Sequence, residues 1–418
     1  MTYTQKVNKF VGILLFLTAF SVYSTAQNVA FEGLKRTKAA YLQKFIGWDK
    51  QVPTDSARII KALFLIRNTR FFNDVSFDIR TEGTDTLITF KCQEIHTALP
   101  LFELGASAGN KWVRLGIEDE NGLGKGIRSI VFYQYNDRHS FYIKQAFPLV
   151  FKKWGLNYLV KKWSVLEPLN LDNQRNTFLY TNIDAELTTQ YAFDINRHDI
   201  EFGVGYMSET YALPMDENGN RMVNMYGFDR LILKGNHQIN QLNYTSFYLN
   251  GWANKFNFLT SYDPTNKTTF GFFSNETTYF KTLPTKANLA FRSRFGISTN
   301  NNVFLAPFIL DNYYNIRSIG NKVDRGTASL ALNFEYRQTL WENKLFGFQV
   351  VGFTDAGTWR TPDGVLIDML NSKNMKVFAG IGGRFIYKKA YDAIIRLDYG
   401  YGIKGEGKGF VFGLGQYF

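Results

Sequence analysis

Strict alternation of apolar and polar residues is the property of this sequence that most restricts its possible fold. The pattern is clearest in residues 326–337, where one face carries Asn333, Glu335 and Arg337. The other face consists of Ala328, Leu330, Leu332, Phe334 and Tyr336. A period of two residues is typical of a β-strand with one face in an apolar environment and the other in water. We therefore expect a chain built mainly from amphipathic strands.

The same alternation recurs through residues 98–418 and predicts about 16 strands, with about 20 residues for each strand and its connection. The connections alternate in length. The short ones fall at residues 121–126, 194–198, 283–286, 341–344 and 388–391, and the long ones include residues 213–227, 261–269, 304–325 and 361–372. Short turns at one rim and long loops at the other are typical of membrane-spanning barrels. We predict an all-β transmembrane barrel of about 16 antiparallel strands; a soluble β-sandwich is the alternative.

Composition is consistent with such a barrel. Aromatic residues make up 17% of the chain, although its mean hydropathy is slightly negative. Alternating strands combine these two properties, whereas apolar membrane helices would raise the hydropathy. The formal net charge of +12 is spread along the strands instead of being clustered, so we do not expect nucleic-acid binding. Such charges suit a polar lumen, exposed loops and anionic lipid head groups.

The N-terminus has the features of a signal peptide, which we place at residues 1–26. Lys6 and Lys9 precede an apolar run at residues 11–20 that is too short to span a membrane as a helix. Small residues then precede Gln27, where cleavage is expected. No cysteine directly follows the apolar run, so a lipoprotein anchor is not expected.

Residues 27–97 are expected to form a small α+β domain. The predicted order is a strand at 28–32, a helix capped by Thr37, a second helix opened by residues 53–55, and strands at 75–81 and 86–94. Cys92, the single cysteine, alternates in phase with the apolar residues of the last strand and is expected to be a small core residue.

This β-α-α-β-β order resembles a POTRA domain, the periplasmic polypeptide-binding module of outer-membrane assembly and translocation proteins. The residues that carry the resemblance are 31–37 and 71–75. Such a module has exposed strand edges, to which an extended client could add a strand through main-chain hydrogen bonds. An inert spacer that only orients the barrel is the alternative role.

The mature chain as a whole resembles the BamA/TamA-type family, in which POTRA modules precede a 16-stranded outer-membrane barrel. Residues 121–126 resemble the glycine-rich turn after the second barrel strand, and residues 334–337 and 352–357 resemble two later strands. Ile316, Arg317, Ser318, Ile319 and Gly320 stand where the family has its inward-folding sixth loop. The resemblance implies a location in the outer membrane of a Gram-negative-type bacterium, with the POTRA domain in the periplasm.

The resemblance also implies a lumen lock, in which Arg317 contacts Glu335, Phe353 and Asp355. A guanidinium group can bind carboxylates bidentately and stack on an aromatic ring, so these residue types suit such a contact. The alternative is that the charges are separately solvated in the lumen. Two departures from the loop motif are present: Ser318 replaces the expected glycine, and Ile319 replaces an aromatic residue.

Two further sets of residues are assigned from the barrel ends. Gly105, Gly109, Gly413 and Gly415 are expected to weaken a lateral seam between the first and last strands, predicted at 101–108 and 409–418. Phe418, in phase with Phe410 and Phe412 on the predicted last strand, resembles the terminal aromatic assembly signal of outer-membrane barrels. An ordinary last strand is the alternative.

Sequence motifs for covalent chemistry are weak. Residues 105–109 spell G-x-S-x-G, but they fall in a predicted barrel strand without the following helix that a nucleophile elbow needs. The four histidines are widely spaced, and neither a P-loop nor a Rossmann fingerprint is present. We expect neither an enzyme nor a cofactor or metal site.

The function that the resemblance implies is an outer-membrane insertase or translocase. Its expected partners are unfolded or extended outer-membrane or secreted polypeptides, outer-membrane lipids and accessory assembly subunits. A dedicated secretion pore for one partner protein is the main alternative. A passive porin and a surface anchor or receptor built on an insertase scaffold are further ones. Only one POTRA module is expected where general insertases usually carry several, which argues against a housekeeping assembly role.

Overall fold

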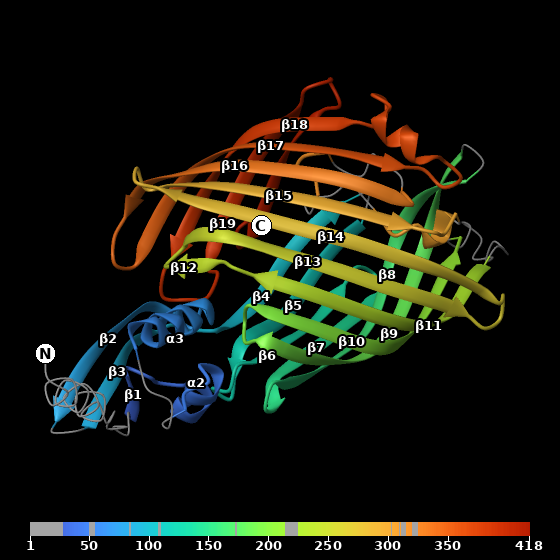
Figure 1. Ribbon diagram of the computed structural model, residues 1–418. Coiled ribbons are helices and arrows are strands. Elements are labelled where there is room, and N and C mark those ends of the chain that lie inside the picture. The colour runs from blue at the N-terminus through green and yellow to red at the C-terminus, as the bar shows by residue number, and fades with distance from the viewer. Residues whose placement is uncertain are drawn as a thin grey trace, which may run out of the picture.

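The computed structural model describes residues 28–49, 55–82, 85–107, 110–171, 174–213, 225–301, 303–308, 310, 315–319 and 325–418. The predicted signal peptide, together with Gly109 and Gly320, lies outside these residues. The described part consists of a small N-terminal α+β domain set against one rim of a large β-barrel (Figure 1). No helix in this part is long and apolar enough to span a membrane.

The barrel is closed and antiparallel, as predicted. Going round the ring, each long strand neighbours the next in sequence, and β20 neighbours β4. Within the described residues it has sixteen strands of seven or more residues and one of three, β12. The strands are β4 (Ala98–Ser107), β5 (Asn110–Gly122), β6 (Ile127–Tyr135), β7 (His139–Phe151), β8 (Trp154–Leu171), β9 (Gln174–Asp194), β10 (His198–Ala212), β11 (Met225–Asn240), β12 (Asn243–Thr245), β13 (Tyr248–Asp263), β14 (Thr268–Leu283), β15 (Ala287–Ser298), β16 (Ala328–Glu342), β17 (Phe346–Arg360), β18 (Lys376–Tyr387), β19 (Ile394–Gly402) and β20 (Lys408–Leu414).

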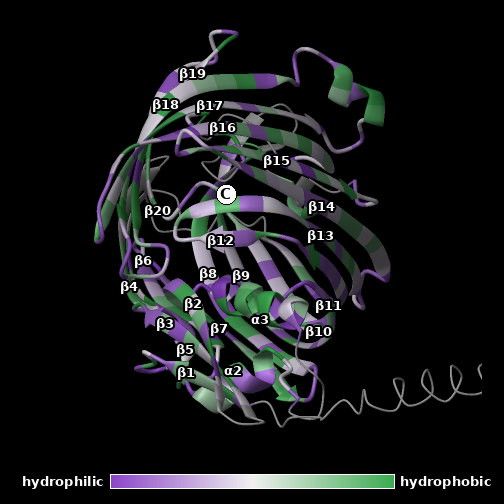
Figure 2. Cartoon of the chain, turned by 60° about the vertical axis from the view of Figure 1, so that its left-hand side comes forward, coloured by the Kyte–Doolittle hydropathy of each residue, from purple (hydrophilic) through white to green (hydrophobic). Residues whose placement is uncertain are grey.

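Alternation along the strands separates the two faces of the wall. On β16, Phe334 and Tyr336 are exposed on the outside, whereas Glu335 and Arg337 are buried inside. Hydrophobic and hydrophilic bands succeed one another along the barrel strands (Figure 2). Large apolar side chains on the outside and charges on the inside are the pattern of a wall that faces lipid.

The N-terminal domain has the predicted β-α-α-β-β order. Its sheet has the order β1-β3-β2, and its elements are β1 (Asn28–Glu32), α2 (Ala39–Phe45), α3 (Ser56–Asn68), β2 (Phe72–Glu82) and β3 (Asp85–Glu94). Strands β1 and β3 are parallel, and β2 and β3 form an antiparallel hairpin.

The two helices of this domain begin differently from each other. Asp55 caps α3, because its side chain accepts a hydrogen bond from the Arg58 N–H at 2.8 Å. The prediction that Thr37 caps α2 was wrong: the N-cap residue is Lys38, without a side-chain bond. The Thr37 hydroxyl instead bonds to Glu94, a partner distant in sequence.

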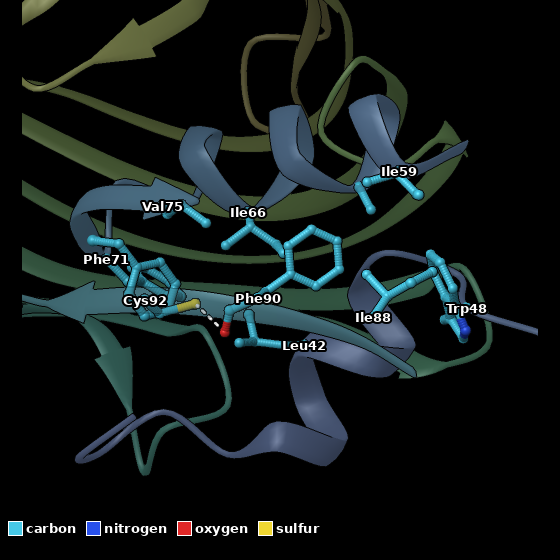
Figure 3. Close-up of a cluster of buried hydrophobic side chains, with 11 residues drawn as sticks. Leu42, Trp48, Ile59, Ile66, Phe71, Val75, Ile88, Phe90 and Cys92 are labelled. Atoms are coloured by element: carbon cyan, nitrogen blue, oxygen red, sulfur yellow. Dashed lines mark hydrogen bonds between the residues drawn. The ribbon is translucent and has the colours of Figure 1, made fainter. Parts of the chain in front are cut away.

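The domain core lies between the helices and the sheet, where Leu42, Ile66, Val75 and Phe90 are fully buried (Figure 3). Cys92 belongs to this core, as predicted, and is 5% exposed. Burial and, to a smaller degree, the Glu94 carboxylate raise the pKa of the Cys92 thiol to about 12.

We expect a maleimide reagent near neutral pH to label Cys92 in the folded protein at least about a thousandfold more slowly than in urea, because the thiolate is the reacting form. Mass spectrometry after timed quenching measures both rates. Equal rates in the two conditions would show that the N-terminal core is not formed.

Candidate functional site

The candidate site lies in the barrel lumen, where the segment at residues 315–319 folds inward between β15 and β16. Ile316 and Ile319 are 0% and 1% exposed and pack in one cluster with Trp359 and Phe378 from the wall. Gly357 leaves room for this contact, because a Cβ atom there would lie 2.8 Å from the Ile316 side chain. Ile319 thus fills an apolar site although the family motif has an aromatic residue at this position.

Arg317 is fully buried and bonds to both carboxylates that the sequence assigned to it. Its Nε and Nη2 atoms donate to the two Asp355 oxygens at 2.8 Å each, and its main-chain N–H donates to Asp355 Oδ2 at 3.0 Å. Its Nη1 atom bonds to Glu335. The guanidinium carbon lies 3.7 Å from the centre of the Phe353 ring. The structure therefore brings together the four residues of the lumen lock: Arg317, Glu335, Phe353 and Asp355.

The lumen lock belongs to a larger buried ionic network. Arg337 Nε donates to Glu335 at 2.6 Å, and Arg384 Nη1 donates to Asp398 at 2.6 Å. Arg317 Nη1 also lies 3.5 Å from Asp398, which joins the two halves. The described groups of the network comprise five guanidinium groups, from Arg292, Arg317, Arg337, Arg384 and Arg396, and three carboxylates, from Glu335, Asp355 and Asp398.

Aromatic rings stabilise the excess of positive charge in this network. The Tyr417 ring has three guanidinium carbons near its centre, from Arg317 at 4.0 Å, Arg292 at 4.8 Å and Arg396 at 5.1 Å. Arg292 also lies 4.8 Å from the Phe418 ring. The interaction free energy between a cation and an aromatic face is more favourable when water is excluded, as it is here.

The residues after β20 leave the barrel wall, so the predicted strand at 409–418 was too long. Strand β20 ends at Leu414, and Gly415 takes a φ of +76°, a left-handed conformation that glycine adopts without strain. The C-terminal end then lies inside the barrel (Figures 1 and 2). Phe418 packs on Phe280, and its carbonyl oxygen accepts a bond from Arg337 at 2.9 Å.

Phe418 is therefore out of phase with the outward side chains of β20. Phe410 and Phe412 are exposed on the outer face, whereas Phe418 points into the lumen. The in-phase arrangement predicted for Phe418 was wrong, because the turn at Gly415 redirects the chain. Its role as an assembly signal stays a prediction.

Two lumenal glycines make room for the network. A Cβ atom at Gly413 would lie 2.4 Å from the Arg396 guanidinium, and one at Gly382 would lie 1.9 Å from Asp398. Gly413 and Gly415 thus have structural roles within the lumen: Gly413 gives space to Arg396, and Gly415 makes the turn.

Gly105 lies within β4, where its backbone pairs with Trp112 of β5.

Ser318 contacts the last strand. Its φ of +70° lies in the left-handed region that favours the glycine of the family motif. Its hydroxyl donates to the Gly409 carbonyl oxygen of β20 at 2.8 Å, a bond that glycine could not make. The loop therefore holds both β17, through Arg317, and β20, through Ser318.

The N-terminal domain is fixed to several turns of the nearer rim. Asn68 at the end of α3 donates to the Leu242 carbonyl at 2.6 Å, and the Arg70 guanidinium pairs with Asp392 at 3.2 Å. The Lys38 N–H donates to the Gly124 carbonyl at 2.9 Å. A Cβ atom at Gly124 would lie 2.0 Å from a main-chain oxygen of this domain, so the glycine-rich turn at 121–126 is a docking point.

Glu94 organises the segment that makes this contact. Its carboxylate accepts bonds from the main-chain N–H of Thr37 at 2.8 Å and of Arg36 at 3.0 Å, and from Lys35. Arg36 in turn donates to Asp119 of β5 at 3.1 Å. Burial opposes ionisation of Glu94, but these bonds outweigh it and hold the pKa of Glu94 below its ordinary value of 4.5.

We expect Glu94→Gln to lower the stability of the N-terminal domain by about 1 kcal/mol at neutral pH, a value reduced for solvent screening because Glu94 is partly exposed. The lowered pKa means that the carboxylate stabilises the folded state above pH 4.5, and that this stabilisation is lost as the pH falls through the folded-state value. Hydrogen exchange of β1–β3 between pH 7 and 3 measures both effects. Glu32→Gln, exposed at the end of β1, is the matched control; an equal change in both variants contradicts the role of Glu94.

Comparison with known proteins gives structural neighbours only. No family model matches the sequence, and no curated protein matches it. A structure of BamA from Haemophilus ducreyi lacking POTRA domains 1–3 superposes over 93% of this chain and 84% of its own, with 14% identity and a TM-score of 0.56. CdiB from Escherichia coli matches over 93% and 73%, with 11% identity and a TM-score of 0.61. CdiB from Acinetobacter baumannii matches over 94% and 74%, with 12% identity and a TM-score of 0.59.

This chain has the fold of the BamA and CdiB barrels. The resemblance drawn from the motifs is thus confirmed at the level of the fold. Within this BamA-like and CdiB-like barrel, the sequence reasoning missed Asp398, Tyr417 and four arginines of the network, Arg292, Arg337, Arg384 and Arg396. Arg337 shares the lumenal face of β16 with Glu335, so alternation alone could have identified it. Tyr417 has the lumenal phase of β20, but only the turn at Gly415 takes it off the wall and against the arginines.

The described residues contain no group of three or more His, Cys, Asp or Glu side chains that could hold a metal ion. The G-x-S-x-G stretch begins on β4, and the chain continues into strand β5. The candidate site can hold the lumen loop against the barrel wall, on β17 through Arg317 and on β20 through Ser318.

Proposed function

We propose that this protein is an outer-membrane translocase that receives extended polypeptides at its N-terminal domain and assists their insertion into the outer membrane. The observation that carries the proposal is the lumen loop, held by a fully buried arginine in a barrel with the fold of BamA and CdiB. A passive porin would need an open lumen, whereas here residues 315–319 and 416–418 occupy it.

The N-terminal domain supports a role in handling polypeptides. It has the element order of a POTRA module, and β1 and β2 form the edges of its sheet. An edge strand can bind an extended client through main-chain hydrogen bonds. Because the domain is docked to the barrel rim, a client bound there would lie beside the barrel.

The last strand supports lateral insertion. β20 has seven residues, fewer than the roughly 9–11 of a spanning strand, and it closes the ring against β4. A short closing strand offers few hydrogen bonds at this seam, so opening there costs less than at β8–β9, where eighteen residue pairs are in register. An opened seam exposes strand edges to which a client strand can pair.

Cross-linking the seam tests this mechanism. A Cys92→Ser background would carry Phe102→Cys together with Phe410→Cys, Phe412→Cys or Leu414→Cys, joined by a bismaleimide. Before cross-linking, the protein in lipid vesicles should accelerate the folding of a urea-unfolded outer-membrane barrel. We expect cross-linking to abolish this acceleration. Heat-modifiable electrophoretic mobility of the client measures folding.

A matched control places the cross-link between β16 and β17, through Phe334→Cys and Thr354→Cys, which face each other in register. The control should leave activity unchanged, since that pair is already closed. No acceleration before cross-linking would refute the proposal.

A dedicated secretion pore is the second candidate, because the two CdiB structures have the higher TM-scores. This function would carry one partner through the lumen after the loop has left it. If transport of the partner survives the seam cross-link but is lost when the lumen loop (residues 315–319) is tethered to β17, the dedicated pore is favoured.

A further inference from the structure

The connection between β17 and β18 folds back over the outside of the barrel. It contains the short helix η2 (Leu366–Leu370), at the rim far from the N-terminal domain (Figure 1). Phe353 and Asp355 point into the lumen, so alternation places Thr358 on the outer face of β17. Thr358 is nevertheless only 6% exposed, and its hydroxyl donates to the Met369 carbonyl at 2.7 Å. Helix η2 therefore covers the outer wall.

Hydrogen bonds hold this connection in place. Asp368 Oδ2 accepts from the Val365 N–H at 2.8 Å, so the one acidic side chain of the helix is turned back to its start. Asn374 Nδ2 donates to the Asp368 carbonyl at 3.0 Å. Only Met369 of the helix is buried against the barrel.

The opposite side of this connection is apolar and uncovered. Val365, Leu366, Ile367 and Leu370 are between 50% and 69% exposed. The short helix that precedes β18 is largely green, hydrophobic, in Figure 2. Four adjacent large apolar side chains on one exposed turn form a patch that normally marks a contact with a protein or a lipid. We call these four residues the rim patch.

Two observations favour lipid as the occupant of the rim patch. The patch adjoins the outer wall, since η2 contacts β16 and β17 and bonds to Thr358 on the outer face of β17. Ile381 on the outer face of β18 is 67% exposed. Two basic side chains lie beside the patch. Lys373 and Lys404 are exposed in the adjacent connections, and the Lys404 ammonium bonds to the Ser372 carbonyl at 3.1 Å. Apolar residues with flanking lysines are typical of a segment at an anionic membrane surface.

We propose that the rim patch inserts into the outer leaflet, with its apolar side chains among the upper acyl chains and Lys373 and Lys404 at anionic head groups. The site is thus a lipid-binding element on the wall of the barrel, packed on β16 and β17. It is independent of which polypeptides the protein handles, and so it goes beyond the proposed function.

The test places an environment-sensitive NBD fluorophore at Ile367→Cys in the Cys92→Ser background of the full chain, reconstituted in phosphatidylcholine vesicles. We expect emission shifted to shorter wavelengths and strong quenching by lipids that carry a nitroxide near the head group. Thr265→Cys, in the exposed turn after β13 at the same rim, is the matched control and should emit as in water. Water-like, unquenched emission at position 367 would overturn the proposal. A shifted but unquenched signal would also overturn it, because protein and not lipid would then cover the patch.

Two further variants separate the apolar and the ionic contributions to membrane insertion of the rim patch. Leu370→Asp should lower the ratio of inserted to exposed label at position 367 by about tenfold or more, since burial of a leucine side chain is lost. Adding phosphatidylglycerol should strengthen insertion, and Lys404→Gln should weaken this gain by about fivefold. No response to phosphatidylglycerol would exclude the anionic head groups from the site.

Discussion

Replacing Arg317 by alanine should lower the free energy of unfolding of the barrel by about 3–5 kcal/mol, the cost of leaving buried carboxylates without their partner. Asp355 would lose two side-chain bonds at 2.8 Å, and Glu335 would lose one of its guanidinium partners. Neither carboxylate can turn to water, because both are 0% exposed. Urea unfolding in detergent micelles, followed by tryptophan fluorescence, measures the change.

Two control variants make this prediction specific. Arg325→Ala removes another arginine of the same inter-strand segment, whose partner Glu167 lies at 2.9 Å and is partly exposed, so a smaller loss is expected. Arg317→Lys keeps the charge but loses the bidentate geometry and should fall between the two. If Arg317→Ala and Arg325→Ala destabilise equally, the lumen lock is not the main contact that holds the loop.

Replacing Tyr417 by alanine should destabilise the barrel by about 3 kcal/mol and loosen its last strand. The substitution removes a ring that faces three guanidinium groups at 4.0–5.1 Å, and it leaves a cavity among like charges. Because the docked segment begins directly after β20, its release should also free the end of that strand. We expect faster hydrogen exchange in β20 and unchanged exchange in β8 and β9.

Phe412→Ala provides the comparison on the same strand. Phe412 is 67% exposed on the outer face, so its loss should change the exchange of β20 little and should not disturb the ionic network. Equal effects of Tyr417→Ala and Phe412→Ala would mean that strand length and not lumenal docking controls the seam.

Alternation in the sequence determined the wall of this protein. Leu332, Phe334 and Tyr336, placed on the outside of β16 by its period of two, are exposed there. Glu335 and Asp355 face the lumen because the same period leaves them no other side. The loop motif added Arg317 as their cation. These assignments depend only on local structure. Once one residue of a strand is known to face the lumen, alternation decides the face of every other residue on that strand.

Only the tertiary structure decided what else enters the lumen. A single left-handed turn at Gly415 takes Tyr417 and Phe418 off the wall that alternation predicts for them. The other arginines of the network meet because β15, β16, β18 and β19 curve round to one side of a closed ring. The helix η2 lies over the outer wall through one bond from Thr358, a partner that no sequence period indicates. Contacts of this kind depend on ring closure and chain reversal, which bring together residues that are far apart in the sequence.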